Sequence, residues 1–124
     1  MTADERNIST LIVARPGPLR SGLWAMLTMM PQIESVKQVS DASAIRSAVK
    51  KHDPALVLLD GNLPRNGIAP VLEMIKGNGY QGRCLVLADD VEQQQEAESA
   101  GADMALVKGF PAGMLFEIVA ELVG

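Results

Sequence analysis

The stretch PALVLLD at residues 54–60 decides the fold of this chain. Its aliphatic residues follow one another without a polar break, which is typical of a strand covered on both faces of a parallel sheet. Pro54 separates the run from the segment before it, and Asp60 ends it. Doubly wound sheets place their sites outside the carboxyl ends of such strands. Asp60 is therefore the first candidate for a functional side chain.

Four more blocks of strand length accompany this one along the chain. They lie at 8–14, 33–39, 83–88 and 104–108. The block at 33–39 alternates apolar and polar residues and carries Glu34 and Lys37, which is typical of a strand at the edge of a sheet. Cys84 lies in another block, where we expect an inert buried thiol. The sequence therefore predicts five strands, one of them at an edge.

Between the blocks, apolar residues recur at the spacing of one helix face. Leu19, Leu23 and Leu27 follow this spacing. Pro18 suits a first helical residue and Pro31 ends the run. Further helices are predicted after a cap at Asp41, at 68–76, at 91–101 and at 112–123. The segment 91–101 is almost wholly polar, so we expect it to lie thinly on the surface.

A strand followed by a helix thus occurs five times in succession. Because crossovers between parallel strands are right-handed, this order gives a parallel sheet with helices on both faces. We predict an α/β fold, a flavodoxin-like doubly wound sheet of five strands in the order 2-1-3-4-5 with five helices. The 124 residues make one domain, residues 1–124.

Composition excludes several classes of protein. A net charge of −4 disfavours a nucleic-acid interface built on bulk positive charge, and a single cysteine excludes an intramolecular disulfide. The first residues, MTADERNIST, are polar and acidic, unlike a secretory signal. No apolar run approaches the roughly 20 residues that cross a bilayer. We therefore expect a cytoplasmic protein without a membrane segment.

Several short motifs have structural explanations. The stretch GNGYQG at 77–82 follows a predicted helix and leads into a strand, the reverse of the dinucleotide-binding context, so it is interpreted as a helix stop and a turn. His52 is the only histidine and is expected on a loop, where it supports neither a catalytic triad nor a zinc site. Lys50 and Lys51 are interpreted as a solvated helix end.

Charged side chains stand at the carboxyl ends of four predicted strands. Arg15 follows the first strand, Asp60 ends the third, Asp89 follows the fourth and Lys108 ends the fifth. These ends converge over one crevice in a doubly wound sheet. Asp60 alone has a structural explanation as an Asx-turn or helix cap. Its placement together with Lys108 favours a functional site in which the two form an ion pair.

Three ordered segments carry a resemblance to a known family. They are LIVARPGPLRSGL at 11–23, PALVLLDGNLPRNG at 54–67 and AGADMALVK at 100–108. Over essentially its whole length the chain resembles the receiver domain of bacterial two-component response regulators, in the subclass that carries a LuxR-type helix-turn-helix output domain. The resemblance implies that Asp60 occupies the phosphoacceptor position. It also implies protein partners, with DNA binding only through an output domain absent from this chain.

The chain departs from that family at positions that serve phosphorylation. In the family the aspartate attacks a phosphohistidine or a small phosphodonor, with Mg²⁺ held by an acidic pair at the end of the first strand. Here those positions are Ala14 and Arg15. The hydroxyl residue of the fourth strand is Ala88, the switch aromatic is Ala105 and the proline after the lysine is Gly109. We therefore expect no metal and no cofactor at this site.

Three functions are compatible with these residues. The leading hypothesis is an atypical receiver that is not an enzyme and acts through protein–protein interaction, independently of Mg²⁺-dependent phosphorylation. The alternative is a conventional receiver phosphorylated on Asp60 by a histidine kinase, with Asp89 and Asp90 as the local carboxylates. The third is a phosphohydrolase of haloacid-dehalogenase type, which has a second aspartate where this chain has Asn62.

Two further predictions concern individual side chains. The Arg15 guanidinium is expected to approach Asp60 or Asp89 and to supply the positive charge of a metal; the alternative is that it points to solvent. Trp24 on the first helix, with Phe116 and Val123 on the last, flanks the buried faces of two neighbouring helices. These residues are candidates for a homodimer interface; the alternative is that the aromatics tuck between the helices as peripheral core.

Overall fold

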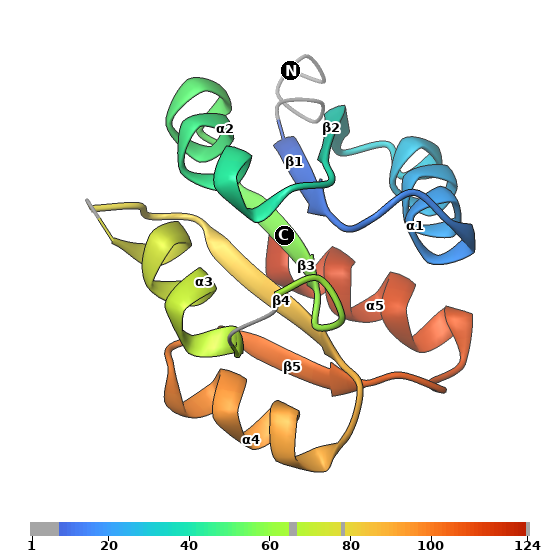
Figure 1. Ribbon diagram of the computed structural model, residues 1–124. Helices are drawn as coiled ribbons and strands as arrows, with labels where there is room; N and C mark the ends of the chain where they lie inside the picture. Colours follow the sequence, from blue (N-terminus) through green and yellow to red (C-terminus); the bar gives the residue numbers. More distant parts are fainter. Residues whose placement is uncertain (1–7, 65–66, 78, 124) are drawn as a thin grey trace.

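The computed structural model describes residues 8–64, 67–77 and 79–123. Strands and helices alternate along the chain (Figure 1). The strands are β1 (Ile8–Val13), β2 (Ile33–Val39), β3 (Leu56–Asp60), β4 (Arg83–Ala88) and β5 (Met104–Val107). The α-helices are α1 (Pro18–Met29), α2 (Ile45–His52), α3 (Ile68–Lys76), α4 (Val91–Ser99) and α5 (Ala112–Val123), and a 3₁₀ turn, η2 (Ala42–Ala44), precedes α2.

The strands form one parallel sheet in the order β2-β1-β3-β4-β5. This order confirms the predicted doubly wound topology. It also confirms that β2, the strand with alternating polarity, lies at an edge. In the register of the sheet, Val13 pairs with Leu59 and Asp60 pairs with Leu87, so the carboxyl ends of the central strands are level.

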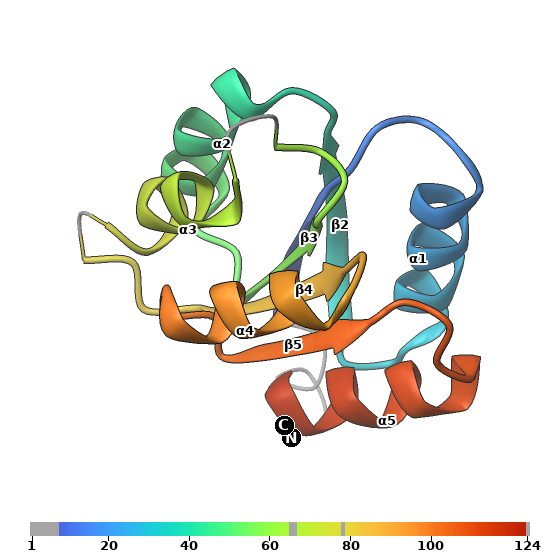
Figure 2. The same cartoon turned by 60° about the horizontal axis from the view of Figure 1, so that its bottom comes forward.

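Two apolar cores lie on opposite faces of this sheet. One face packs against α2, α3 and Ala97 of α4, and the other packs against α1 and α5. Figures 1 and 2 show these two groups of helices on either side of the strands. Successive residues of β3 alternate between the cores, with Val57 and Leu59 in one and Leu56 and Leu58 in the other. Coverage on both faces explains why the run at 56–59 contains no polar residue.

The helices bury the predicted faces, with one difference at a helix end. Leu23 and Leu27 are the buried residues of α1, and α4 buries Ala97 alone, as its polar sequence indicates. The prediction that His52 lies on a loop is wrong, because His52 is the last residue of α2. The helix continues that far because Asp53 adopts a left-handed conformation and its amide donates to the Val49 carbonyl, which closes the helix without a glycine.

Other local predictions hold. Asp41 is a cap, as predicted, but of the turn η2 and not of α2: it accepts a hydrogen bond from the Ser43 amide at 3.0 Å, and α2 begins after Ala44 without a side-chain cap. Gly77 ends α3 and the chain turns toward β4, with Asn78 outside the described residues. Cys84 is a buried free thiol, and burial raises its pKa to about 12. Within the described residues, no helix has the length and apolar character needed to cross a membrane.

Candidate functional site

Asp60 lies at the carboxyl end of β3 with its side chain largely buried. Its Oδ1 accepts a hydrogen bond from the Asn62 amide at 3.0 Å, which is the geometry of an Asx-turn. The same oxygen contacts the Lys108 ammonium at 2.5 Å. The predicted Asx-turn and the predicted ion pair are therefore both present, because one carboxylate oxygen accepts from the Asn62 amide and also contacts Lys108.

Lys108 bridges two carboxylates from neighbouring strands. It follows β5 directly, and its Nζ lies 2.5 Å from Asp60 and 2.7 Å from Asp89. Burial acts to lower the pKa of Lys108, but the hydrogen bonds and charges of the two carboxylates outweigh it and raise that pKa. The ammonium is therefore held in its charged form between the ends of β3 and β4.

Arg15 does not occupy the position predicted for it. Its Nη2 donates to the Leu63 carbonyl at 3.3 Å, and within the described residues it forms no ion pair with Asp60 or Asp89. The guanidinium is directed at the loop after β3, and the cation that contacts both carboxylates is Lys108. Arg15 is exposed and instead bridges from the end of β1 to the loop after β3.

The alanines around Asp60 offer no polar side-chain atom. Ala14 is 1% exposed, Ala88 is 0% exposed and Ala105 is 2% exposed, so each packs within the fold. Gly109 has φ 104, a conformation closed to proline, whose ring fixes φ near about −65°.

Gln93 belongs to the site although sequence reasoning missed it. Its Nε2 donates to the Gly61 carbonyl at 2.9 Å, and its Oε1 accepts from the Asp89 amide at 2.8 Å. Gln93 of α4 thus contacts Gly61, the residue after Asp60, and also Asp89, while Lys108 contacts both aspartates. These contacts connect the end of β3 to the start of α4. A sequence signal existed, because Asp90 caps α4 and a Gln stands three residues later, a spacing related to the capping box.

The residues present do not fit a magnesium ion. Mg²⁺ prefers near-octahedral oxygen ligands, several of them from carboxylates or water. The end of β1 supplies Ala14, without a ligand atom, and Arg15, which carries only donors. Both nearby carboxylates already contact Lys108. Within the described residues no group of three or more His, Cys, Asp or Glu side chains is arranged to hold a metal.

Comparison with known proteins defines the class of this chain. The family model described as the response regulator receiver domain matches residues 11–120. The chain therefore belongs to the receiver-domain family of two-component response regulators. Receiver domains are signalling modules that interact with proteins such as histidine kinases and output domains.

Individual relatives agree with this assignment. The chain is 29% identical over 119 residues to the transcriptional regulatory protein DegU of Brevibacillus brevis, covering 94% of this chain and 50% of that protein. It thus spans about half the length of the curated relative it matches.

Solved structures share the fold. The signal receiver domain of NarL from Mycobacterium tuberculosis matches with a TM-score of 0.83 at 19% identity, covering 95% of this chain and 97% of that one. The chemotaxis response regulator CheY4 of Vibrio cholerae matches with a TM-score of 0.80 at 18% identity, covering 93% and 98%. The predicted family and the predicted flavodoxin-like fold are both confirmed.

Proposed function

We propose that this receiver signals through contacts with other proteins, without Mg²⁺-dependent phosphorylation of Asp60. The end of β1 is the single observation that carries the proposal. Ala14 is buried there, and Arg15 donates to the Leu63 carbonyl, so β1 provides no carboxylate beside Asp60. Charge on a transferring phosphoryl group needs a metal or an equivalent cation cluster to offset it. This chain lacks the acidic pair through which its family recruits that metal.

The ion pairs of Lys108 support the same conclusion. A metal approaching Asp60 would be repelled by an ammonium that lies 2.5 Å from one carboxylate and 2.7 Å from the other. Ala88 and Ala105 add support, because neither the hydroxyl that would bond a phosphoryl group nor the aromatic switch side chain is present. We infer that Lys108, and not a bound metal, supplies the positive charge beside Asp60.

Treatment with acetyl phosphate and Mg²⁺ tests the proposal directly. We expect intact-mass spectrometry to show no phosphorylated species of the wild type, and beryllofluoride with Mg²⁺ to give no saturable change. Restored variants provide the positive control. Arg15→Asp keeps the buried core unchanged because Arg15 is exposed, and Ala14→Glu/Arg15→Asp rebuilds both acidic positions. At least one of these should gain Mg²⁺-dependent labelling, and adding Asp60→Asn should abolish that gain.

The other two functions give different results in this experiment. A wild type that acquires one phosphoryl group on Asp60 in Mg²⁺ is a conventional receiver, with Asp89 and Asp90 as the available acids. A wild type that releases inorganic phosphate catalytically, with loss of turnover in Asp60→Asn, is a phosphohydrolase. Either result overturns the proposal.

The flank of α1 and α5 is our proposed surface for self-association. Trp24 is 46% exposed and Phe116 is 43% exposed, on helices that pack over the same face of the sheet. This exposure favours an interface over a purely internal position for the aromatics. Val123 is partly buried against the core beneath α5, so it contributes at the edge.

Sedimentation decides between a homodimer and a monomer. We expect wild type to show concentration-dependent association and Trp24→Glu/Phe116→Glu to sediment as a monomer. Ala25→Glu, at an exposed position of α1, is the control for the effect of a glutamate on the stability of that helix. A monomeric wild type at high concentration, or an undisturbed dimer in the double variant, would remove this surface from consideration.

A further inference from the structure

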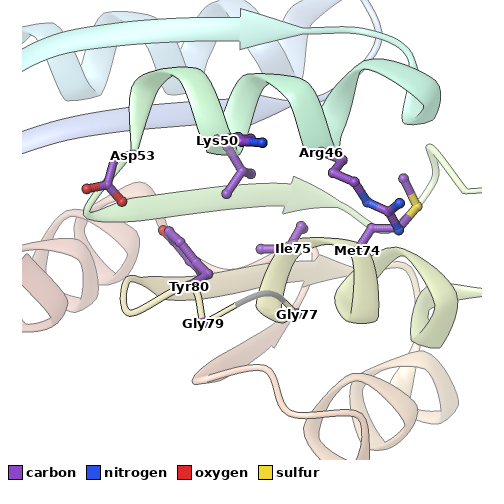
Figure 3. Close-up of a pocket in the computed structure, with 9 residues that line it drawn as sticks. Arg46, Lys50, Asp53, Met74, Ile75, Gly77, Gly79 and Tyr80 are labelled. Carbon is purple, nitrogen blue, oxygen red and sulfur yellow. The ribbon is translucent and has the colours of Figure 1, made fainter.

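A groove between α2 and α3 lies away from the Asp60 site. Its volume is about 290 Å³, and its lining includes Arg46, Val49 and Lys50 of α2, Met74 and Ile75 of α3, and Tyr80 before β4. Figure 3 shows Arg46 and Lys50 on α2 opposite Met74, Ile75 and Tyr80. Asp53 and Tyr80 precede β3 and β4, so the groove reaches toward the amino ends of the strands, whereas Asp60 lies at the carboxyl end.

The floor of this groove is apolar and its aromatic wall is fixed. Val49 is 8% exposed and Ile75 is 0% exposed, while Met74 is half-buried above them. The Tyr80 hydroxyl donates to the Pro54 carbonyl, and Lys76 Nζ lies 6.0 Å from the centre of the ring. Burial also raises the pKa of Tyr80, so the hydroxyl stays protonated and keeps its hydrogen bond. The wall is thus formed before any ligand arrives.

The rim of the groove carries two cations with no partner in the described residues. Arg46 and Lys50 stand four residues apart, on one face of α2, and both are exposed. Neither forms an ion pair within the part of the chain that the structure describes. The helix contains no acidic residue, although the whole chain has a net charge of −4. Asp53, the one acid of the lining, lies at the Tyr80 end, away from Arg46 (Figure 3).

We propose that this groove binds a small amphipathic anion, a flat ring system that bears one carboxylate. The ring system lies on Met74 and the exposed edge of Val49, against Tyr80, and the carboxylate points to the cations of α2. Arg46 offers a planar set of donors that matches a carboxylate, and Lys50 adds a second charge. The volume is at the low end of the roughly 300–1,000 Å³ typical of ligand pockets, which limits the ligand to about one or two fused rings. The site does not depend on the state of Asp60.

Methyl NMR with 2-naphthoate as the probe tests this site. The methionine methyl signals distinguish binding in the groove from binding to the exposed flank of α1 and α5. Met74 lines the groove, whereas Met29 and Met114 are exposed on α1 and α5. We expect saturable shifts at Met74, and weaker binding of 2-naphthylmethanol, which has the same rings without the charge. Arg46→Gln/Lys50→Gln should weaken 2-naphthoate binding by about tenfold, the sum of two solvent-exposed ion pairs.

A matched variant controls for net charge. Lys37→Gln/Lys51→Gln removes two exposed cations that do not line the groove, and we expect it to bind as wild type does. Circular dichroism of both variants should match wild type, since all four side chains are exposed. Absence of saturable shifts, equal affinity for the neutral probe, equal weakening in both variants, or shifts confined to Met29 and Met114 would each overturn the proposal.

Discussion

Replacing Lys108 with methionine tests the centre of the site. Lys108 Nζ contacts Asp60 at 2.5 Å and Asp89 at 2.7 Å. Methionine keeps most of the length of the side chain but removes its charge. Asp60, whose side chain is 12% exposed, then keeps its hydrogen bond from the Asn62 amide, whereas Asp89, at 41% exposed, is solvated by water. The variant therefore leaves one poorly solvated carboxylate without its cation.

The magnitude follows from the exposure of the partners. Removing one partner of a buried ion pair costs about 3–5 kcal/mol, whereas an exposed pair contributes about 0–1 kcal/mol. Lys108 is 30% exposed and Asp60 is 12% exposed, so the pair lies between these limits. We expect Lys108→Met to lower the free energy of unfolding by about 2 kcal/mol. Asp60→Asn removes the buried charge itself, so it should cost less, about 1 kcal/mol.

Urea unfolding of both single variants and the double variant measures the coupling. Once Asp60 is asparagine, Lys108→Met should cost only about 0.5 kcal/mol, which gives a coupling near 1.5 kcal/mol. Lys37→Met, at an exposed position, is the control and should change stability by less than about 0.5 kcal/mol. Additive single variants, or a Lys108→Met that unfolds like the control, would show that the ion pair does not stabilise the fold.

The same pair has a defined pH dependence. The folded-state pKa of Lys108 is raised above the ordinary value of 10.5, so its stabilising contribution is complete below that value and is lost as pH rises through the folded pKa. The gap in stability between wild type and Lys108→Met should be constant at neutral pH and should narrow only above 10.5. A gap that already narrows near neutral pH would contradict the raised pKa.

Three other side chains give independent predictions. Gln93→Ala removes the hydrogen bonds to the Gly61 carbonyl and from the Asp89 amide, so it should lower the free energy of unfolding in urea by about 1–2 kcal/mol. The exposed control Gln95→Ala should lower it by less than about 0.5 kcal/mol, and equal losses would show that the two hydrogen bonds of Gln93 do not stabilise the fold. Cys84 is the only thiol, and burial raises its pKa to about 12, so the rate of its reaction with a disulfide reagent should be limited by the rate at which the protein unfolds. Rapid labelling of the native protein would contradict this burial. Tyr80 is the only tyrosine, and burial raises its pKa, so the absorbance of tyrosinate should appear only when the protein unfolds. The free energy of unfolding should fall as pH rises through 10.0, the ordinary pKa of tyrosine, and ionisation of the folded protein at that pH would contradict the prediction.

The fold was predictable because its signals are repeated and mutually consistent. The aliphatic run at 56–59 faces two cores, and the polar alternation of 33–39 faces solvent on one side, so each pattern reports the position of its strand. The ion pair of Asp60 and Lys108 was predictable for the same reason. The backbone of Asp60 is fixed by the end of β3 and that of Lys108 by the end of β5, so the topology of the sheet alone brings the two side chains together.

Arg15 and Gln93 were not predictable from strand ends alone. Arg15 has a long, exposed side chain, and its partner, the Leu63 carbonyl, lies on a loop whose course the strand pattern does not define. Gln93 joins Gly61 to Asp89 across two loops, a contact that depends on tertiary structure although its cap spacing is visible in the sequence. The error at His52 has a local cause, because the left-handed turn falls on Asp53, which is not a glycine.

The polar character of α4 has a consequence for the motions of the domain. Ala97 is the only buried residue of α4. Hydrogen bonds also hold the helix to the rest of the domain: Gln93 donates to the Gly61 carbonyl, Gln94 donates to the Ala105 carbonyl, and Glu96 accepts from the amides of Ile68 and Ala69. Water competes for such bonds, and detaching the helix exposes little apolar surface. Amide protons of α4 should therefore exchange through a local opening, while those of β3 exchange only through global unfolding. Each opening also breaks the bonds of α4 to the amides of Ile68 and Ala69 and to the Gly61 carbonyl, so we expect the start of α3 to lose protection together with α4.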